Sequence, residues 1–146
     1  MKTIKCFILC VLFAVIPTIT FAQSMSSIVD KSSNLVSYIE KEHDLEVVRI
    51  EMDILHDSKS TIRNLQTGWN YIIVAFGDER FKDIDVKVYK RLGGDWTLVK
   101  KDNDSSSVAM VDISPEYTSD YKIEIIAYSF EPGYDVGHYG LIIAHE

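Results

Sequence analysis

The stretch from Trp69 to Asp104 places the tightest constraint on how this chain can fold. It contains three runs with strand character, each bounded by turn-forming residues: Trp69–Phe76, Asp83–Lys90 and Asp95–Lys101. The middle run alternates between two sets, Ile84, Val86 and Val88 on one face and Asp85, Lys87 and Tyr89 on the other. Alternation with a period of two residues is typical of a half-buried β-strand. The stretch therefore predicts three consecutive short strands.

Further strands are predicted on both sides of this stretch. They are Leu45–Leu55, with Val48, Ile50, Met52 and Ile54 expected on one face, then Thr61–Leu65, Val108–Ile113, Tyr121–Phe130 and His138–His145. The run Trp69–Phe76 is apolar on both faces, which is typical of a central strand. About eight short strands with no helix between them favour an antiparallel β-sandwich or jelly roll over a parallel α/β fold.

The first 22 residues have the pattern of a secretory signal peptide. Lys2 and Lys5 give a basic start, and an apolar run follows from Cys6 to Ile16. Thr20 and Ala22 then place small residues at the two positions that a signal peptidase reads. The apolar run is too short to serve well as a transmembrane helix. We therefore expect cleavage after Ala22, a secreted or periplasmic protein, and no membrane insertion once the signal is removed.

The segment 23–44 is the helical candidate of the chain, and residues 45–146 form the predicted β-sandwich domain. Apolar residues recur at helical spacing, so that one stripe contains Ile28, Val29, Leu35, Val36 and Ile39. Ser26 or Ser27 is expected to cap the helix, with Asp30 in its first turn. Such a stripe must be buried against another element.

The central strands indicate where this stripe packs. Apolar rows occur on both of their faces, whereas a two-sheet sandwich buries only one face of each sheet. In the run Trp69–Phe76, one apolar row is Ile72, Val74 and Phe76, and the row on the opposite face contains Tyr71 and Ile73. In the run Tyr121–Phe130, the second row contains Ile126 and Tyr128. We therefore predict that Ile28, Leu35, Val36 and Ile39 cover this outer surface.

Charge and cysteine content exclude several classes of function. Both cysteines, Cys6 and Cys10, lie in residues 1–22, so residues 23–146 contain no disulfide and no cysteine-based site. The same residues contain 13 basic and 22 acidic side chains. This acidic balance argues against binding nucleic acid or an anionic membrane through overall charge.

Asp83, Asp85, Asp102 and Asp104 are the candidate metal ligands. Calcium prefers carboxylate and carbonyl oxygens, which an acidic loop cluster supplies. The spacing of an EF-hand is absent, and Asp is also a common turn residue because it bonds to its own backbone. Solvated turns are thus the alternative interpretation, and no other cofactor is expected.

The sequence does not favour an enzyme. It has no H-E-x-x-H or G-x-S-x-G motif. The histidines His43, His56, His138 and His145 lack the spacing that would direct two rings at one metal ion. Without a nucleophile or metal motif, we predict a non-catalytic protein.

Aromatic residues are numerous for a domain of this size: Trp69, Tyr71, Trp96, Tyr117, Tyr121, Tyr128, Tyr134 and Tyr139. If exposed, such residues could stack on sugars or on a peptide. We expect most of them to be core or corner residues instead. Tyr117 and Tyr121, which follow Pro115, have the pattern of a strand corner whose hydroxyl bonds back to the chain.

The segment Asp83–Ile125 resembles the bacterial pre-peptidase C-terminal domain, a jelly-roll β-sandwich attached to many secreted hydrolases. The resemblance rests on a D-x-D-hydrophobic-x-hydrophobic-Y strand at 83–89, an acidic and Asn-containing strand end at 99–104, and P-x-Y-T-x-x-Y at 115–121. It implies a non-catalytic accessory or substrate-binding role, and some members of that family bind calcium. Two departures are the absence of an attached catalytic domain and the helical segment that precedes the sandwich.

Three hypotheses about function follow. The first is a secreted, non-catalytic binding or accessory module that recognises a protein or a glycan. The second is a small secreted enzyme whose site matches no motif, and the third is an envelope or matrix component that self-associates. A deep pocket lined by convergent acids or histidines would favour the enzyme, and exposed aromatic residues would favour binding.

Overall fold

The computed structural model describes residues 25–146, which form one α-helix and eight β-strands. The helix α2 spans Ser26–Glu42. The strands in chain order are β1 Glu46–Leu55, β2 Ser58–Leu65, β3 Tyr71–Gly77, β4 Phe81–Leu92, β5 Asp95–Asp102, β6 Val108–Ile113, β7 Ser119–Phe130 and β8 Gly137–His145. The mainly β fold class with an N-terminal helix is thus confirmed. The predicted signal peptide, residues 1–22, lies outside the described residues.

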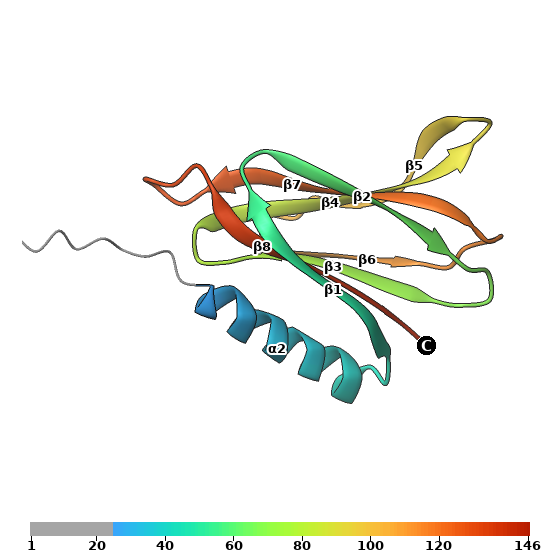
Figure 1. The fold of residues 1–146 in the computed structure, drawn as a ribbon, viewed down its shortest axis with the longest axis horizontal. Helices are drawn as coiled ribbons and strands as arrows, with labels where there is room; N and C mark the ends of the chain where they lie inside the picture. The colour runs from blue at the N-terminus through green and yellow to red at the C-terminus, as the bar shows by residue number, and fades with distance from the viewer. Residues whose placement is uncertain (1–24) are drawn as a thin grey trace, which may run out of the picture.

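The strands form two four-stranded antiparallel sheets that pack face to face (Figure 1). One sheet has the order β1-β8-β3-β6, and we call it the helix-side sheet because α2 lies against it. The other has the order β2-β7-β4-β5, and we call it the open sheet. Strand β3 pairs with both β6 and β8, which confirms the central position predicted from its two apolar faces.

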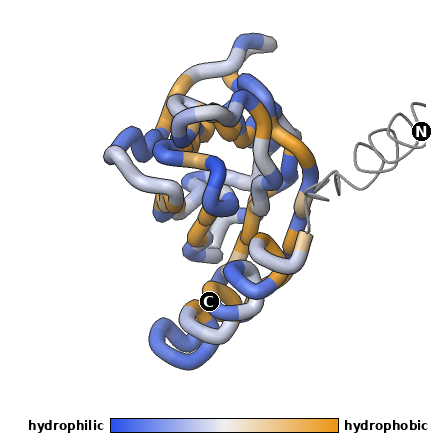
Figure 2. The backbone as a smooth tube through the Cα atoms, turned by 90° about the vertical axis from the view of Figure 1, so that its left-hand side faces the viewer, coloured by the Kyte–Doolittle hydropathy of each residue, from blue (hydrophilic) through white to orange (hydrophobic). Residues whose placement is uncertain are grey.

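The main core lies between the two sheets. Alternate residues of each strand point inward, as the period of a β-strand requires. From β4 the inward residues are Ile84, Val86 and Val88, as predicted, and all three are fully buried. From β3 they are Tyr71, Ile73 and Ala75. Figure 2 colours each residue by its hydropathy, and hydrophobic segments run through the body of the sandwich.

The helix α2 covers the outer face of the helix-side sheet. Ile28 and Ile39 are buried there in a second cluster that contains Val74, Phe76 and Ile142. Leu35 and Val36 pack against the same cluster and are half-buried. For this sheet, the prediction that the helix covers an outer apolar row is therefore confirmed. Burial of large aliphatic side chains stabilises the fold by about 1.5–3 kcal/mol each before entropy is subtracted.

Close packing under the helix depends on a glycine in β8. Gly140 pairs with Phe76 of β3. A Cβ atom built on Gly140 would lie 2.1 Å from the Phe76 ring, so no larger residue fits without movement of the ring. Because Gly140 has no side chain, the ring of Phe76 can occupy this space.

The start of the helix differs from the prediction. The N-cap residue is Met25, and no side chain caps the helix. The hydroxyl of Ser27 instead donates to the carboxylate of Glu79, which lies between β3 and β4. Val29, expected in the buried stripe, is 48% exposed because the stripe that contacts the sheet is centred on Ile28 and Ile39. No helix of residues 25–146 has the length and hydropathy needed to cross a membrane.

A bulge changes the faces of β1. The register shifts between Val47 and Arg49, so Val47 and Met52 both lie on the helix side although they are an odd number of residues apart. The predicted row from Val48 to Ile54 is therefore wrong at its start. Ile50 and Ile54 do face outward with Met52, but they remain 46% and 55% exposed because β1 is an edge strand.

The second apolar row of β7 is not covered by the helix. Ile126 and Tyr128 belong to the open sheet, and Tyr128 is 71% exposed. The prediction that one helix covers both outer rows is wrong for these residues. The two sheets turn their outer faces in opposite directions, so a single helix reaches only one of them.

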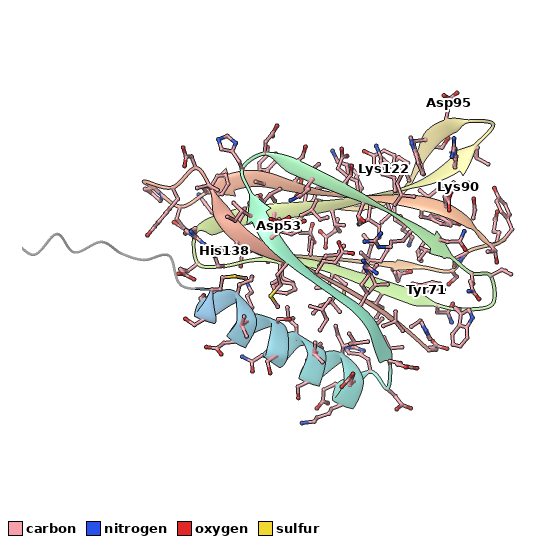
Figure 3. The ribbon with its side chains drawn as sticks, viewed as in Figure 1. Asp53, Tyr71, Lys90, Asp95, Lys122 and His138 are labelled. Carbon is pink, nitrogen blue, oxygen red and sulfur yellow. The ribbon has the colours of Figure 1, made fainter. Side chains whose placement is uncertain are left out.

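A buried ionic network holds the turn that follows β3. Nε of Arg80 donates to both carboxylate oxygens of Asp78, at 3.1 and 2.9 Å, and the backbone N–H of His138 donates to the same carboxylate at 3.0 Å. All three residues are buried (His138 in Figure 3). The network joins the β3–β4 turn to β8 at the end of the sandwich where the helix begins.

Candidate binding site on the open sheet

The outer face of the open sheet is a mixed surface of apolar, aromatic and charged side chains. In an antiparallel sheet, residues directly opposite one another share a face. One such row crosses all four strands and consists of Ile62, Lys122, Tyr89 and Leu98. Ile62 and Leu98 are 53% and 45% exposed. The row therefore offers apolar area to a partner at the two edges of the sheet.

Tyr89 is held rigidly at the middle of this row. Nζ of Lys122 lies 4.1 Å from the centre of its ring, and its hydroxyl donates to Oε2 of Glu124 at 2.7 Å (Lys122 in Figure 3). Burial, together with the hydrogen bond to Glu124 and the charge of that carboxylate, raises the pKa of Tyr89 to about 12. The phenol therefore stays neutral at physiological pH, and the ring is fixed in orientation.

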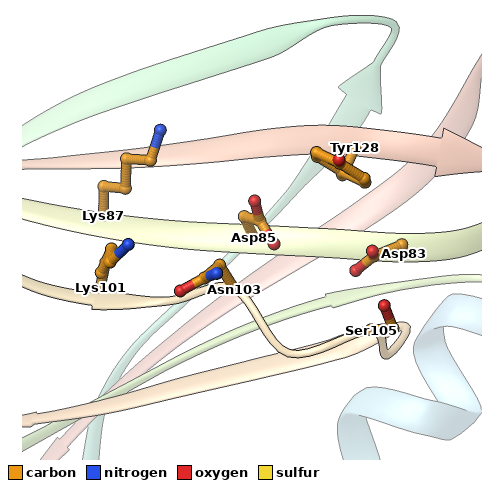
Figure 4. Close-up of a pocket in the computed structure, with 7 residues that line it drawn as sticks. All are labelled: Asp83, Asp85, Lys87, Lys101, Asn103, Ser105 and Tyr128. Atoms are coloured by element: carbon orange, nitrogen blue, oxygen red, sulfur yellow. The ribbon is translucent and has the colours of Figure 1, made fainter.

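A polar hollow of about 270 Å³ opens on the same face, next to this row (Figure 4). Strand β4 contributes Asp83, Asp85 and Lys87, β5 contributes Lys101, the loop after β5 contributes Asn103 and Ser105, and β7 contributes Tyr128. Three strands and one loop thus direct donors and acceptors into one space. Tyr128 lies at the rim, where its ring is open to solvent.

The two carboxylates of the hollow differ in their partners. Asp83 is 5% exposed, and its Oδ1 accepts a hydrogen bond from the backbone N–H of Ser106 at 3.3 Å. Asp85 is 6% exposed, and it forms no hydrogen bond or ion pair with any of residues 25–146. Burial, and next the charge of Asp83, raise the pKa of Asp85. Asp85 is therefore an acceptor without a protein partner within residues 25–146, and its carboxylate is reached through the hollow that it lines.

Only two of the four predicted calcium ligands reach this hollow. Asp102 accepts hydrogen bonds from the backbone N–H groups of Asp104, at 3.0 Å, and Met110, at 2.7 Å. It thereby ties the end of β5 to the edge strand β6. Within residues 25–146, no group of three or more histidine, cysteine, aspartate or glutamate side chains is arranged to hold a metal ion. Calcium at Asp83, Asp85, Asp102 and Asp104 stays a prediction.

The aromatic residues divide into core and surface. Tyr71, Tyr121 and Tyr139 are buried, as the core interpretation expected, and Trp96 is half-buried. The other four are between 41% and 71% exposed: Trp69, Tyr117, Tyr128 and Tyr134. The expectation that most are core or corner residues is therefore wrong for half of the set. Within the described chain the hydroxyls of Tyr117 and Tyr121 form no hydrogen bond, so the predicted corner bond is absent.

The sequence alone did not indicate several of the residues that line the hollow. Alternation along β4 already placed Asp85 and Lys87 on one face, which was the available signal for Lys87. Lys101, Asn103 and Ser105 had no such signal, because their position depends on how β5 and its loop lie beside β4. Local patterns do not report pairing between strands.

Comparison with known proteins supports the fold. No family model matches the chain, and no curated protein matches it. The pre-peptidase C-terminal domain of a collagenase from Bacillus anthracis is a similar solved structure, with a TM-score of 0.50 and 9% identity over 65% of this chain and 87% of that one. A periplasmic inhibitor of g-type lysozyme from Aeromonas hydrophila has a TM-score of 0.49 and 9% identity, over 67% and 85%. The resemblance to the pre-peptidase C-terminal domain is thus confirmed as a likeness of fold.

Proposed function

We propose that this protein is an exported, non-catalytic binding module that holds its partner, a protein or a glycan, on the outer face of the open sheet. One observation supports this above the others. The helix covers the outer face of one sheet, whereas the other presents Tyr128, 71% exposed, beside a hollow with the unpartnered carboxylate of Asp85. Exposed aromatic side chains with convergent polar groups are typical of recognition surfaces.

The chemistry of the lining supports binding over catalysis. Asp83 and Asp85 lie two residues apart on one strand and therefore project from the same side of the sheet. The residues that line the hollow include no histidine to act as a base or a metal ligand. An acceptor pair on one side is suited to holding a ligand.

Export is part of the proposal and rests on the pattern of residues 1–22. Protein produced from the full sequence in a secreting bacterial host should appear outside the cytoplasm with Gln23 at its N-terminus. Mass spectrometry of the exported form decides this. An exported protein that still begins at Met1 would contradict the predicted cleavage.

The binding face is tested with a glycan array and a pull-down of proteins, both using the exported form. Leu98→Glu should weaken binding of any partner found, because it places a charge in the exposed apolar part of the face. Met110→Glu is the matched control, since Met110 is 52% exposed on the outer face of the helix-side sheet. Equal loss in both variants would contradict the proposal. Release of reducing ends from a bound glycan would identify an enzyme, and concentration-dependent oligomers without a partner would favour self-association.

Calcium is a competing proposal for the same hollow. Asp83 and Asp85 would supply carboxylate oxygens, and Asn103 and Ser105 would supply neutral ones. Millimolar calcium should then raise the melting temperature, because a ligand that binds only the folded state stabilises it. The increase should disappear in Asp85→Asn. An unchanged melting temperature in the wild-type protein would leave these aspartates without a metal role.

A further inference from the structure

We propose that the hollow bordered by Asp83, Asp85 and Tyr128 is a subsite for one uncharged sugar residue, bound through its hydroxyl groups and stacked against the tyrosine ring. The inference rests on the proposed function and specifies the ligand of that binding face. Of the two classes of partner named above, a protein or a glycan, it selects the glycan for this position.

The first argument is that no group within residues 25–146 donates a hydrogen bond to the Asp85 carboxylate. A buried polar group without a partner is costly, and a buried ionised carboxylate more so. Asp85 is 6% exposed and forms no hydrogen bond or ion pair within residues 25–146. Burial, and next the charge of Asp83, raise its pKa, although the charges of Lys87 and Lys101 oppose the shift. The free oxygen of Asp83 adds a second acceptor at its side. A ligand with several O–H donors would satisfy both.

The second argument is the balance of charge around the hollow. Two carboxylates, from Asp83 and Asp85, face two ammonium groups, from Lys87 and Lys101. A cationic ligand would lie beside the two lysines, and an anionic ligand beside the two aspartates. Sugar hydroxyls donate to carboxylates and accept from ammonium groups at once, and they bring no net charge. The lining therefore favours an uncharged polyhydroxyl ligand over an ion of either sign.

The third argument is size and shape. A volume of about 270 Å³ greatly exceeds the roughly 30 Å³ of a single water and lies just below the roughly 300–1,000 Å³ of pockets for drug-sized ligands. One ring-sized unit matches this space. Tyr128 borders the hollow with a ring that is 71% exposed, which is the arrangement needed for stacking on an apolar face of a sugar.

The experiment is a titration of ¹⁵N-labelled exported protein, observed by amide NMR. The probes are the uncharged monosaccharides glucose, galactose, mannose, xylose and N-acetylglucosamine, each added alone to millimolar concentration. At least one of them should shift the backbone amides around Asp85, Asn103 and Ser105. Lysine, acetate and calcium chloride are added in parallel as a cationic, an anionic and a metal probe.

Two substitutions locate the effect. Asp85→Asn keeps the shape of the side chain but halves its acceptor capacity, and it should weaken the sugar response by roughly tenfold or more. Tyr128→Ala should weaken it by a comparable factor because the stacking ring is lost. The matched controls are Asp95→Asn, at the exposed tip of the β4–β5 hairpin, and Tyr134→Ala, which is exposed in the loop after β7. Both controls should bind as the wild type does.

Several outcomes would overturn the inference. They are no response to any sugar, a sugar response confined to residues away from the hollow, equal responses in Asp85→Asn and wild type, and a hollow that responds to calcium, lysine or acetate but not to sugars. The proposed function is judged separately. A partner that is lost in Leu98→Glu, together with a hollow that no sugar perturbs, would keep the binding face and remove the sugar subsite. Absence of any partner would remove the proposed function itself.

Discussion

The two sheets of this sandwich each have four strands, but their outer faces differ. A helix covers the outer face of one sheet, and the outer face of the other is open to solvent. On the helix-side sheet the outward residues at the centre are Val74, Phe76 and Ile142, and these are buried under α2. On the open sheet the corresponding central residues are Tyr89 and Lys122. The Lys122 ammonium lies over the Tyr89 ring, and the Tyr89 hydroxyl donates a hydrogen bond to Glu124. An outer row made only of apolar residues requires a cover, whereas a row that combines an aromatic residue with charged ones can remain in contact with water.

Removal of the cover should have the largest effect. A chain that begins at Leu45 would expose the cluster around Val74 and Phe76 and lose the buried side chains of Ile28 and Ile39. Those two side chains alone account for about 3–6 kcal/mol before entropy. We expect aggregation of the truncated protein or a large fall in its melting temperature, measured by light scattering and calorimetry. A monomeric truncated protein of unchanged stability would show that α2 is not a structural cover.

The buried network at the end of the helix-side sheet should be nearly as important. Burial alone would raise the pKa of Asp78, but hydrogen bonds from Arg80 and from the backbone of His138 hold it below its usual range. Asp78→Ala leaves Arg80 as an unpaired buried charge, so we expect a loss of about 3–5 kcal/mol at neutral pH.

The pH dependence of this variant provides the check. Because the folded-state pKa of Asp78 is depressed, its contribution is present above the unfolded-state pKa of about 3.9 and is lost as the pH falls through the folded value. Denaturant unfolding of the wild type and of Asp78→Ala should therefore converge at acidic pH. A difference that is the same at all pH values would contradict an ionic role.

Paired truncations compare the two outer faces directly. Ile28 is fully buried beneath the helix-side sheet, and Ile28→Ala should destabilise the protein by about 2–5 kcal/mol. Leu98 is 45% exposed on the open sheet, and Leu98→Ala should change stability by at most about 0.5 kcal/mol. Urea unfolding of both variants measures the contrast. Similar losses at the two positions would mean that the open sheet also has a cover.

The smallest expected effect has the opposite sign. The folded-state pKa of Asp85 is raised by burial and by Asp83, so its ionised form destabilises the folded protein. Asp85→Asn should therefore melt slightly above the wild type at neutral pH. The difference should close as the pH falls below the unfolded-state pKa of about 3.9, where Asp85 is protonated in both states. Melting curves across this range test it, and a lower melting temperature for Asp85→Asn would show that Asp85 has a stabilising partner.

Local patterns in the sequence determined the elements of this protein. The alternation in β4 predicted which residues enter the core, the two apolar faces of β3 predicted a central strand, and the stripe of Ile28 and Ile39 predicted a helix that needs a cover. These properties depend on neighbours within a few residues, where the periods of helix and strand apply. The bulge in β1 and the missing serine cap were beyond such patterns because contacts with distant strands decide them.

Tertiary structure decided which sheet stays open and what gathers there. Asp83 and Asp85 are neighbours in sequence, but Tyr128 reaches them through the pairing of β4 with β7, and Asn103 through the loop that follows β5. Asp102, which the sequence grouped with them, turns instead to the backbone of β6. Strand pairing joins residues that are tens of positions apart, and its register is set by packing over the whole sheet. The hollow is therefore a product of the assembled sandwich, whereas the strands that build it are encoded locally.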